Sequence, residues 1–256
     1  MRRIARRAAP LTRGERLAGR RAFVARFARL RTHMVSRQIA DRGIADARLL
    51  AALRAVPREH FVPPHLRRFA YEDGPLPIAA GQTISQPYIV ALMIEAAALA
   101  PQDRVLEIGT GSGYAAAVMS RLAAEIFTIE RHAVLAGDAR RRLAQLGYAN
   151  VAVRLGDGTR GWPEAAPFDA VIVAAGGPEV PDTLRRQLRV DGRLVMPVGR
   201  RRSRQDLVRV RCRGENDFAE DVLGCVSFVP LIGAEGWPEK ASKQDDDGDQ
   251  ACSVLE

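Results

Sequence analysis

The chain has only three cysteines and lacks a long apolar run, and each shortage excludes a class of protein. Cys212, Cys225 and Cys252 are odd in number and widely spaced, which indicates neither a disulfide framework nor a zinc site. The Ala-rich stretch 89–100, which includes Glu95, is shorter than the roughly 20 residues that span a bilayer. We therefore expect no transmembrane segment, no membrane partner and no metal, and a location in the reducing cytoplasm.

Acidic residues are scarce at the N-terminus, where almost all of the positive charge is concentrated. Residues 1–33 contain eleven arginines and a single acid, Glu15, and so carry a net charge of +10. Because the whole chain carries +9, the other 223 residues sum to about −1. A nearly neutral body lacks the basic footprint of a nucleic-acid-binding domain, so we do not expect nucleic acid as a partner.

The basic head, residues 1–33, lacks the long apolar core of a secretory signal, so export is not indicated. Three interpretations stay open: a disordered arm, an amphipathic helix around Phe23, Phe27 and Leu30, or a start codon assigned too early, with translation beginning at Met34. Disorder or a misassigned start is favoured, because Met34 opens a segment that already has a helical pattern.

The rest of the chain has the composition of one globular domain, with 47% hydrophobic and 27% charged residues. We predict a catalytic domain over residues 34–238, between the basic extension 1–33 and an acidic disordered tail 239–256. The tail has no periodic apolar positions and contains the acidic stretch 245–249.

The first part of this domain is predicted to be a helical preface. Apolar residues in 35–55 favour two short helices broken at Gly43. Residues 74–88 contain three prolines and two glycines, which predicts a loop, and 89–99 again has helical character.

From residue 104 onward, short aliphatic strands alternate with helical stretches, which predicts a doubly wound, Rossmann-like α/β fold with a mostly parallel sheet. A further pair of strands, 207–212 and 222–231, predicts an antiparallel addition at one edge. The alternating strands are 105–108, 125–130, 151–157, 168–175 and 193–199, and the helices between them are 113–123, 133–146 and 181–189.

A glycine-rich turn follows the first of these strands and is the strongest signal for a ligand site. The strand ends at Ile108, and Gly109, Gly111 and Gly113 open the next helix. Glycines there permit positive φ and remove the Cβ atoms that would block a ligand lying across the strand ends. The turn alone is also compatible with a nicotinamide or flavin site.

Acidic residues near the turn favour S-adenosylmethionine over a dinucleotide. Glu107 would repel a pyrophosphate but suits the sulfonium and ammonium groups of S-adenosylmethionine. Glu130 closes the next strand, 21 residues after Gly109, where an acid can accept hydrogen bonds from ribose hydroxyls. Asp157, followed by Gly158, ends the third strand beside the expected adenine position.

Five segments in the same order closely resemble the protein-L-isoaspartate O-methyltransferase family. The most specific element is TISQP, within GQTISQPYIVALM, because general methyltransferases share the glycine turn but lack this proline-bounded loop. The resemblance extends from about Met34 to Trp237, and its other segments are VLEIGTGSGY, GDGTRGW, APFDAVIV and GRLVMPVG.

The resemblance implies the methyltransferase fold, S-adenosyl-L-methionine as cofactor and S-adenosyl-L-homocysteine as product. It also implies that L-isoaspartyl and D-aspartyl residues of damaged proteins and peptides are the substrates, and that methylation starts their repair through a succinimide. We expect a monomer with Ser85 as its active-site serine. The expected cofactor-binding residues are Thr83, Ile84, Ser85, Glu107, Gly109, Thr110, Gly111, Glu130, Asp157 and Gly158.

One departure from the family pattern lies after the fourth strand of the alternating series. The chain has AAGGPEVP where the family is expected to have small residues of the Ala-Ala-Pro type. We expect Gly176 and Gly177 to loosen that wall of the site.

Methyl transfer to a carboxylate requires no general base, because a carboxyl group with a pKa of about 4 is already ionised at neutral pH. This agrees with the histidines, which form no evident triad or metal spacing with the serine or the acids. Ser85 is therefore expected to orient the acceptor carboxylate by a hydrogen bond and not to act as a nucleophile. The histidines are His33, His60, His65 and His132.

Two other functions stay open from the sequence. A related methyltransferase could modify the aspartate of one dedicated peptide, with the basic head docking an acidic leader. Alternatively, the chain could be a non-catalytic protein that binds S-adenosylmethionine or nucleic acid, although the intact TISQP segment argues against a loss of catalysis.

Overall fold

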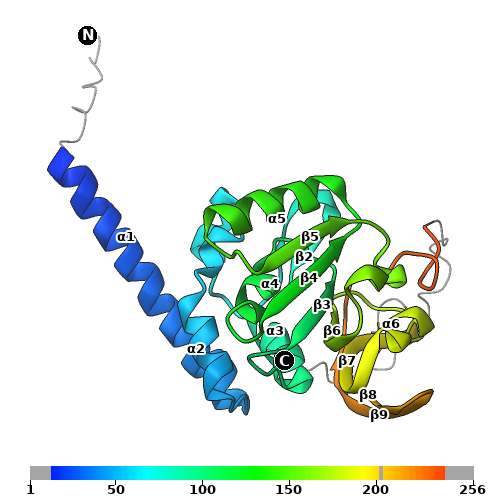
Figure 1. The fold of residues 1–256 in the computed structure, drawn as a ribbon. Coiled ribbons are helices and arrows are strands. Elements are labelled where there is room, and N and C mark those ends of the chain that lie inside the picture. The colour runs from blue at the N-terminus through cyan, green and yellow to red at the C-terminus, as the bar shows by residue number, and fades with distance from the viewer. Residues whose placement is uncertain (1–12, 202–203, 240–256) are drawn as a thin grey trace, which may run out of the picture.

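A seven-stranded sheet with helices on both faces forms the centre of the computed structural model, which describes residues 13–201 and 204–239 (Figure 1). The strand order is β5-β4-β3-β6-β7-β8-β9. The bounds are β3 (Arg104–Ile108), β4 (Glu125–Glu130), β5 (Val151–Leu155), β6 (Phe168–Val173), β7 (Leu188–Arg201), β8 (Arg204–Gly214) and β9 (Asp217–Val226).

The sheet is parallel from β5 to β7 and antiparallel from β7 to β9. The prediction of a mostly parallel α/β sheet with an antiparallel addition at one edge is confirmed. All six residues of β6 are buried, as expected for a strand covered on both faces.

Successive residues of the central strands supply two separate cores, because side chains alternate between the faces of a sheet. Val105 and Ile172 belong to the core under the N-terminal helices, whereas Leu106 and Val171 belong to the core on the opposite face. The helices are α2 (Ala47–Ala55), α3 (Pro87–Ala97), α4 (Tyr114–Met119), α5 (Ala133–Gln145) and α6 (Asp182–Arg186).

Two predicted elements have different bounds in the structure. The helix expected over 181–189 ends at Arg186, because the chain turns directly into β7 at Leu188. The last strand, expected over 222–231, runs from Asp217 to Val226 and then leaves the sheet. Residues 227–231 are consequently free to approach the carboxyl ends of the parallel strands.

The helical preface is present and is longer than expected. Its break at Gly43 is confirmed: this glycine has φ of +100° and ends the turns 34–42 before α2 begins. The Asp46 side chain caps α2 by accepting hydrogen bonds from the amides of Arg48 and Leu49.

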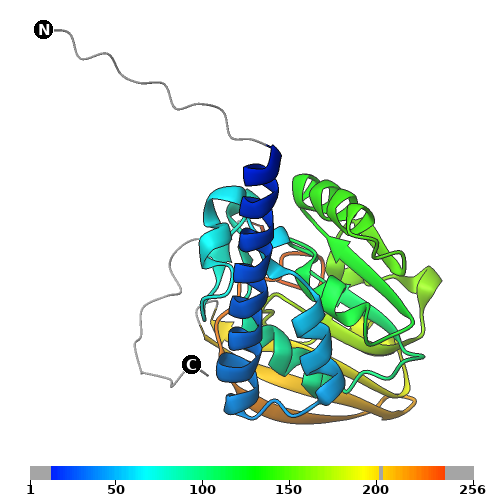
Figure 2. The same ribbon diagram turned by 90° about the vertical axis from the view of Figure 1, so that its left-hand side faces the viewer.

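A long helix, α1 (Arg13–His33), precedes these turns and extends along one side of the domain (Figure 2). Its second half packs on the body, where Phe27 is buried and its ring centroid lies 6.1 Å from that of Tyr71. The structure thus differs from the favoured expectation of disorder over residues 13–33 and agrees with a helix, although of its expected apolar face Phe27 is buried and Phe23 is half exposed. Residues 1–12 and 240–256 lie outside the described residues.

Two expectations concerned membrane-spanning segments and cysteine chemistry. Among the described residues, no helix is long and apolar enough to cross a membrane. Cys212 is a buried free thiol, whereas Cys225 is disulfide-bonded, which the spacing of the cysteines did not suggest.

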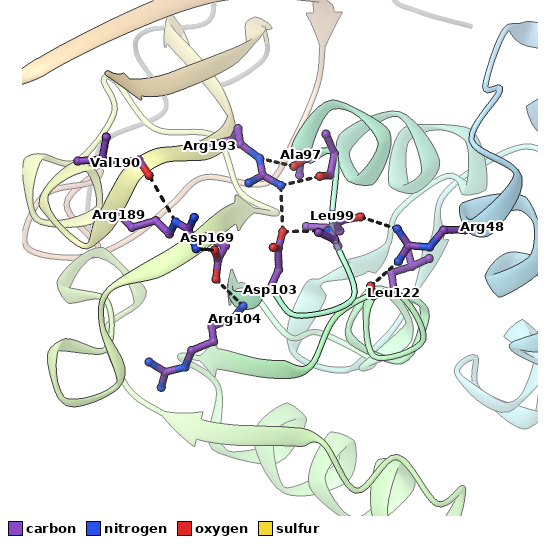
Figure 3. A network of polar contacts seen from close by, with 12 residues as sticks. Arg48, Ala97, Leu99, Asp103, Arg104, Leu122, Asp169, Arg189, Val190 and Arg193 are labelled. Carbon is purple, nitrogen blue, oxygen red and sulfur yellow. Dashed lines mark hydrogen bonds and ion pairs between the residues drawn. The ribbon is translucent and has the colours of Figure 1, made fainter. Parts of the chain in front are cut away.

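A network of charged side chains ties the strands together at the amino ends of β3 and β6 (Figure 3). Arg193 of β7 donates to the carbonyl oxygens of Ala97 and Ala98 at 2.7 and 2.6 Å and contacts the Asp103 carboxylate at 3.0 Å. Asp169 of β6 accepts from the Arg104 amide at 2.8 Å. This edge of the sheet is thereby fixed to the end of α3.

Replacing Arg193 by Met should lower the free energy of unfolding by about 3 kcal/mol, because Asp103 would stay buried without its cation. Urea denaturation followed by circular dichroism measures the loss. Arg37→Met is the matched control, since the Arg37–Asp41 pair is exposed and should contribute less than about 1 kcal/mol. Equal losses for the two variants would contradict a structural role for Arg193.

Candidate active site

A cleft of about 1010 Å³, counted out to open solvent, lies at the carboxyl ends of β3, β4 and β6. Ligands of open α/β sheets bind at this edge. Nine of the ten residues expected from the sequence line the cleft: Thr83, Ile84, Ser85, Glu107, Gly109, Thr110, Gly111, Glu130 and Gly158.

The glycine-rich turn forms the floor of the cleft. Gly109 and Gly111 have φ of +93° and +52°, values that other residues adopt at a cost. The amides of Gly109 and Thr110 both donate to the carbonyl oxygen of Ile129, at 2.8 and 3.3 Å. The turn is therefore fixed to the end of β4, the strand that carries the second predicted acid.

Glu107 is fully buried at the end of β3 and belongs to a chain of hydroxyl groups. The Thr128 hydroxyl donates to Glu107 Oε2 at 2.5 Å, and Thr110 Oγ1 lies 2.6 Å from Thr128 Oγ1. Burial, assisted by the nearby Glu130 carboxylate, raises the pKa of Glu107 to about 8 against the lowering effect of the hydrogen bond from Thr128. A carboxyl group held in this way would be stabilised as an anion by a cationic ligand.

Glu130 links the glycine turn to the start of α5. Its Oε2 accepts from the Gly111 amide and its Oε1 from the His132 amide, both at 2.9 Å. The carboxylate is 4% exposed and its orientation is fixed by these two bonds. Each oxygen has a further lone pair that can accept from a hydroxyl group of a ligand.

Ser85 reaches the cleft from a short hairpin within the predicted loop. Strands β1 (Leu76–Pro77) and β2 (Thr83–Ile84) pair antiparallel, and α3 begins at Pro87, two residues after the serine. Proline suits the first turn of a helix, where its missing N–H is not needed. The serine is half-buried between the hairpin and α3.

A buried arginine that the sequence analysis missed holds this serine in place. Arg58 is inaccessible to solvent, and it donates from Nη2 to the Ser85 carbonyl oxygen at 2.9 Å and from Nε to that of Ala70 at 2.8 Å. Its guanidinium lies 4.9 Å from the centre of the Tyr114 ring, in the first turn of the helix after the glycine turn. Arg58 thus connects both walls of the cleft.

Asp157, the tenth expected residue, does not line the cleft. Its carboxylate accepts from the amides of Thr159 and Ala234, both at 2.9 Å, and from the Thr159 hydroxyl at 2.8 Å. Burial alone would raise its pKa, but these hydrogen bonds from Ala234 and Thr159 hold the pKa below its usual value. These hydrogen bonds anchor the loop around residue 234, and the expected adenine contact stays a prediction.

Gly158 does line the cleft, and its lack of a side chain is required there. A Cβ atom on Gly158 would lie 2.2 Å from Cγ2 of Ile108. The expectation that this glycine relieves crowding agrees with the packing.

The expected loosening of the wall at Gly176 and Gly177 is wrong. The Gly176 amide donates to the Val229 carbonyl oxygen, and its own carbonyl oxygen accepts from the Leu231 amide, both at 2.8 Å. The Trp237 indole also donates to Gly176, at 3.0 Å. The chain after β9 is therefore bound tightly to this wall, and residues 229–232 form a rim of the cleft.

Other lining residues were not singled out from the sequence. Val90, Met93 and Ile94 of α3 supply an apolar wall, and their helical spacing is the same as that of ordinary core residues. His132 also lines the cleft. It follows Glu130 by two residues, and this closeness to the end of the second strand could have indicated its position. Within the described part of the chain, no group of three His, Cys, Asp or Glu side chains could hold a metal ion.

Comparisons with known proteins agree with this site. Residues 29–236 match the model of the family described as protein-L-isoaspartate(D-aspartate) O-methyltransferase. The protein-L-isoaspartate O-methyltransferase of Rhodopseudomonas palustris is 60% identical over 82% of this chain and 97% of its own length. That of Pelobacter propionicus is also 60% identical, over 80% and 91%.

Two solved structures have the same fold. A protein-L-isoaspartate O-methyltransferase structure superimposes with a TM-score of 0.72 and 31% identity, covering 80% of this chain and 67% of the other. A Plasmodium falciparum protein described as a putative member, in complex with S-adenosyl-L-homocysteine, gives a TM-score of 0.68 at 24% identity, over 79% and 98%. With a family match over most of its length, the chain belongs to the protein-L-isoaspartate(D-aspartate) O-methyltransferase family.

Proposed function

We propose that this enzyme transfers the methyl group of S-adenosyl-L-methionine to the carboxylate of L-isoaspartyl residues in proteins and peptides. The observation that carries the proposal is the single cleft that brings Ser85 of the hairpin together with Glu107 and Glu130 at the glycine turn. This arrangement places a hydroxyl donor for an anionic acceptor opposite acids that suit a cationic donor.

The residues at the strand ends fit the cofactor. The fully buried Glu107 has no cation to neutralise it within the described chain, and a ligand with sulfonium and ammonium groups supplies one. Glu130 is oriented to accept from ribose hydroxyls, and Gly109 and Gly111 leave room above the turn. When bound, S-adenosylmethionine supplies an electrophilic methyl group on sulfur.

Ser85 is assigned to the acceptor carboxylate. Its hydroxyl donates a hydrogen bond that fixes one carboxylate oxygen, which leaves the other in line with the methyl group. No proton has to be removed from the acceptor, because it is ionised at neutral pH. The apolar wall from Val90, Met93 and Ile94 excludes water from the reacting pair.

The isoaspartyl substrate rests on membership of the family and on no contact within the cleft. Methylation converts the carboxylate into a methyl ester. The methoxide of this ester is a better leaving group than the oxide that an unmethylated carboxylate would have to expel. The neighbouring amide nitrogen can then close a succinimide, and hydrolysis of this ring returns part of the material to normal aspartate.

The test compares two synthetic peptides that differ only in an L-isoaspartyl or L-aspartyl residue. We expect transfer of the labelled methyl group from S-adenosylmethionine to the isoaspartyl peptide alone. Equal labelling of the two peptides would overturn the substrate assignment, whereas an absence of labelling in both would overturn the proposed activity.

Arg58→Met should reduce kcat about tenfold, because a small displacement of Ser85 misaligns the acceptor. The dissociation constant of S-adenosylmethionine should change little, because the hydrogen bonds of Arg58 go to the carbonyl oxygens of Ala70 and Ser85 and not to Glu107 or Glu130. Arg58→Lys retains one donor and should recover part of kcat. Steady-state kinetics with calorimetry of cofactor binding separates this pattern from general unfolding, which would lower kcat and also weaken cofactor binding.

Several expectations stay predictions. They are the D-aspartyl substrate, the monomeric state, the cytoplasmic location, the domain boundaries at residues 34 and 238, and the separate alternative of one dedicated peptide docked by the basic head.

A further inference from the structure

A second cavity adjoins the active-site cleft on the other side of the glycine turn. We call it the basic cavity and define it by Arg67, Arg141, Arg142, Asp138 and Ser112, which are among the residues that line it. Ser112 also lines the active-site cleft, so the two spaces share this residue as part of their walls. The hairpin that carries Ser85 contributes Ile78 and Ala79 to the same wall.

The basic cavity is lined by three arginines and by one carboxylate, that of Asp138. Asp138 is paired with Arg141 through a short contact, and Arg142 donates from Nη1 to the carbonyl oxygen of Ser112 at 2.7 Å. Arg67 Nε is buried and has no hydrogen-bond partner among the described residues. The cavity therefore carries an excess of positive charge and an unused donor.

The cations are close enough to affect one another. Burial lowers the pKa of Arg142, and the charges of Arg141 and Arg67 lower it further, against the opposing effect of Asp138. An anion in the cavity would relieve this repulsion. Guanidinium groups bind carboxylates and phosphates through paired, charge-assisted hydrogen bonds.

We propose that the basic cavity binds the carboxylate of a Glu or Asp residue of the substrate peptide, close in sequence to the isoaspartyl residue. This inference rests on the proposed function, because the peptide is placed by its acceptor at Ser85. A peptide that follows the hairpin from Ser85 toward Ile78 passes from the cleft to the cavity. The enzyme would then prefer damaged sites in acidic surroundings.

The test uses isoaspartyl peptides in which one flanking position at a time carries Glu or Gln. With S-adenosylhomocysteine present, the dissociation constant of each fluorescent peptide is measured by anisotropy, and methyl transfer is measured separately. At one or more positions, Glu should bind about fivefold more tightly than Gln, the effect expected for one partly solvated charge contact. This preference should weaken in high salt.

Arg67→Gln and Arg141→Gln should each reduce the preference for Glu while leaving the binding of the Gln peptide unchanged. Arg140→Gln is the matched control, because Arg140 lies on the same helix but donates to the Val153 carbonyl oxygen outside the cavity. This control should keep the full preference. An equal loss in all three variants would indicate long-range charge alone and would overturn the site.

Inorganic phosphate distinguishes a peptide side chain from a free anion. Phosphate should compete with the Glu peptide and not with the Gln peptide. If phosphate stabilises the wild type more than Arg67→Gln but Glu and Gln peptides bind equally at every position, the cavity holds a free anion only and the proposal is wrong. Absence of methyl transfer to both peptides would instead reject the proposed activity, and the binding data would still decide the role of the cavity.

Discussion

Ser85→Ala should lower kcat for methylation of an isoaspartyl peptide by about 100-fold or more, the effect of removing one oriented donor from an active site. The hydroxyl lies at the end of the hairpin, held from behind by Arg58 through the Ser85 backbone. The backbone contact survives in the variant, so only the orientation of the acceptor is lost. The dissociation constant of S-adenosylmethionine should stay within a few-fold of the wild-type value.

Ser120→Ala is the matched control for this experiment. Ser120 follows α4, and its hydroxyl donates to the Ala117 carbonyl oxygen, outside the cleft. Its kcat should equal that of the wild type. A Ser85→Ala enzyme with normal kcat would show that the serine does not orient the acceptor.

Glu107→Gln should weaken S-adenosylmethionine binding about 100-fold, because the ligand's cation would lose its fully buried counter-charge. In the wild type, the raised pKa means that binding of the cation releases a proton. Affinity should therefore increase with pH up to about 8 and then level off. The variant should bind with little dependence on pH, and calorimetry in buffers of different ionisation enthalpy measures the released proton.

Without ligand, Glu107→Gln should be more stable than the wild type, although it binds the cofactor more weakly. The pKa of Glu107 is higher in the folded protein than its ordinary value of 4.5, so the folded state holds the proton more tightly than the unfolded state. The stability of the wild type should therefore fall as pH increases from about 4.5 to about 8. At pH 8 ligand-free Glu107→Gln should then unfold at a higher temperature than the wild type.

Glu125→Gln serves as the control for both measurements. Glu125 begins β4 at the opposite edge of the sheet, where its carboxylate is exposed and paired with Arg104. This variant should retain both the affinity and its pH dependence. A Glu107→Gln protein that binds the cofactor normally would contradict the electrostatic role of Glu107.

Features that depend on neighbouring residues could be predicted from the sequence. The strand before Gly109 is buried on both faces and ends in a turn that needs glycine. Residues 105–113 could therefore be predicted together as a strand followed by a glycine-rich turn. The same holds for the alternation of strands and helices. Glu107 and Glu130 followed because parallel strands bring their carboxyl ends to one edge.

Features that depend on distant residues could not be predicted in this way. The carboxylate of Asp157 also accepts from the amide of Ala234, 77 residues later, a bond that no local pattern indicates. Arg58 reaches the Ser85 carbonyl oxygen across 27 residues, and nothing local distinguishes it from an exposed arginine. In both cases the hydrogen bond joins residues that are far apart in the sequence.

The favoured interpretation of the basic head, residues 1–33, also failed to predict its structure where the structure describes it. The helical pattern that begins at Met34 favoured disorder or a misassigned start before it, yet the buried Phe27 anchors the second half of α1 to the domain. Contacts of Phe27, with the partly buried Leu30 beside it, attach this half of the helix, whereas Phe23 is half exposed.

Because the chain after β9 is attached to Gly176, the two sides of the cleft differ in how many backbone hydrogen bonds hold them. On one side, residues 229–231 are joined by backbone hydrogen bonds to Gly176, in the segment that follows β6. The other is a hairpin with only two residue pairs. We therefore expect the hairpin to yield more readily than residues 229–231 when reactants enter and leave, so the element that carries Ser85 would also be the one that moves.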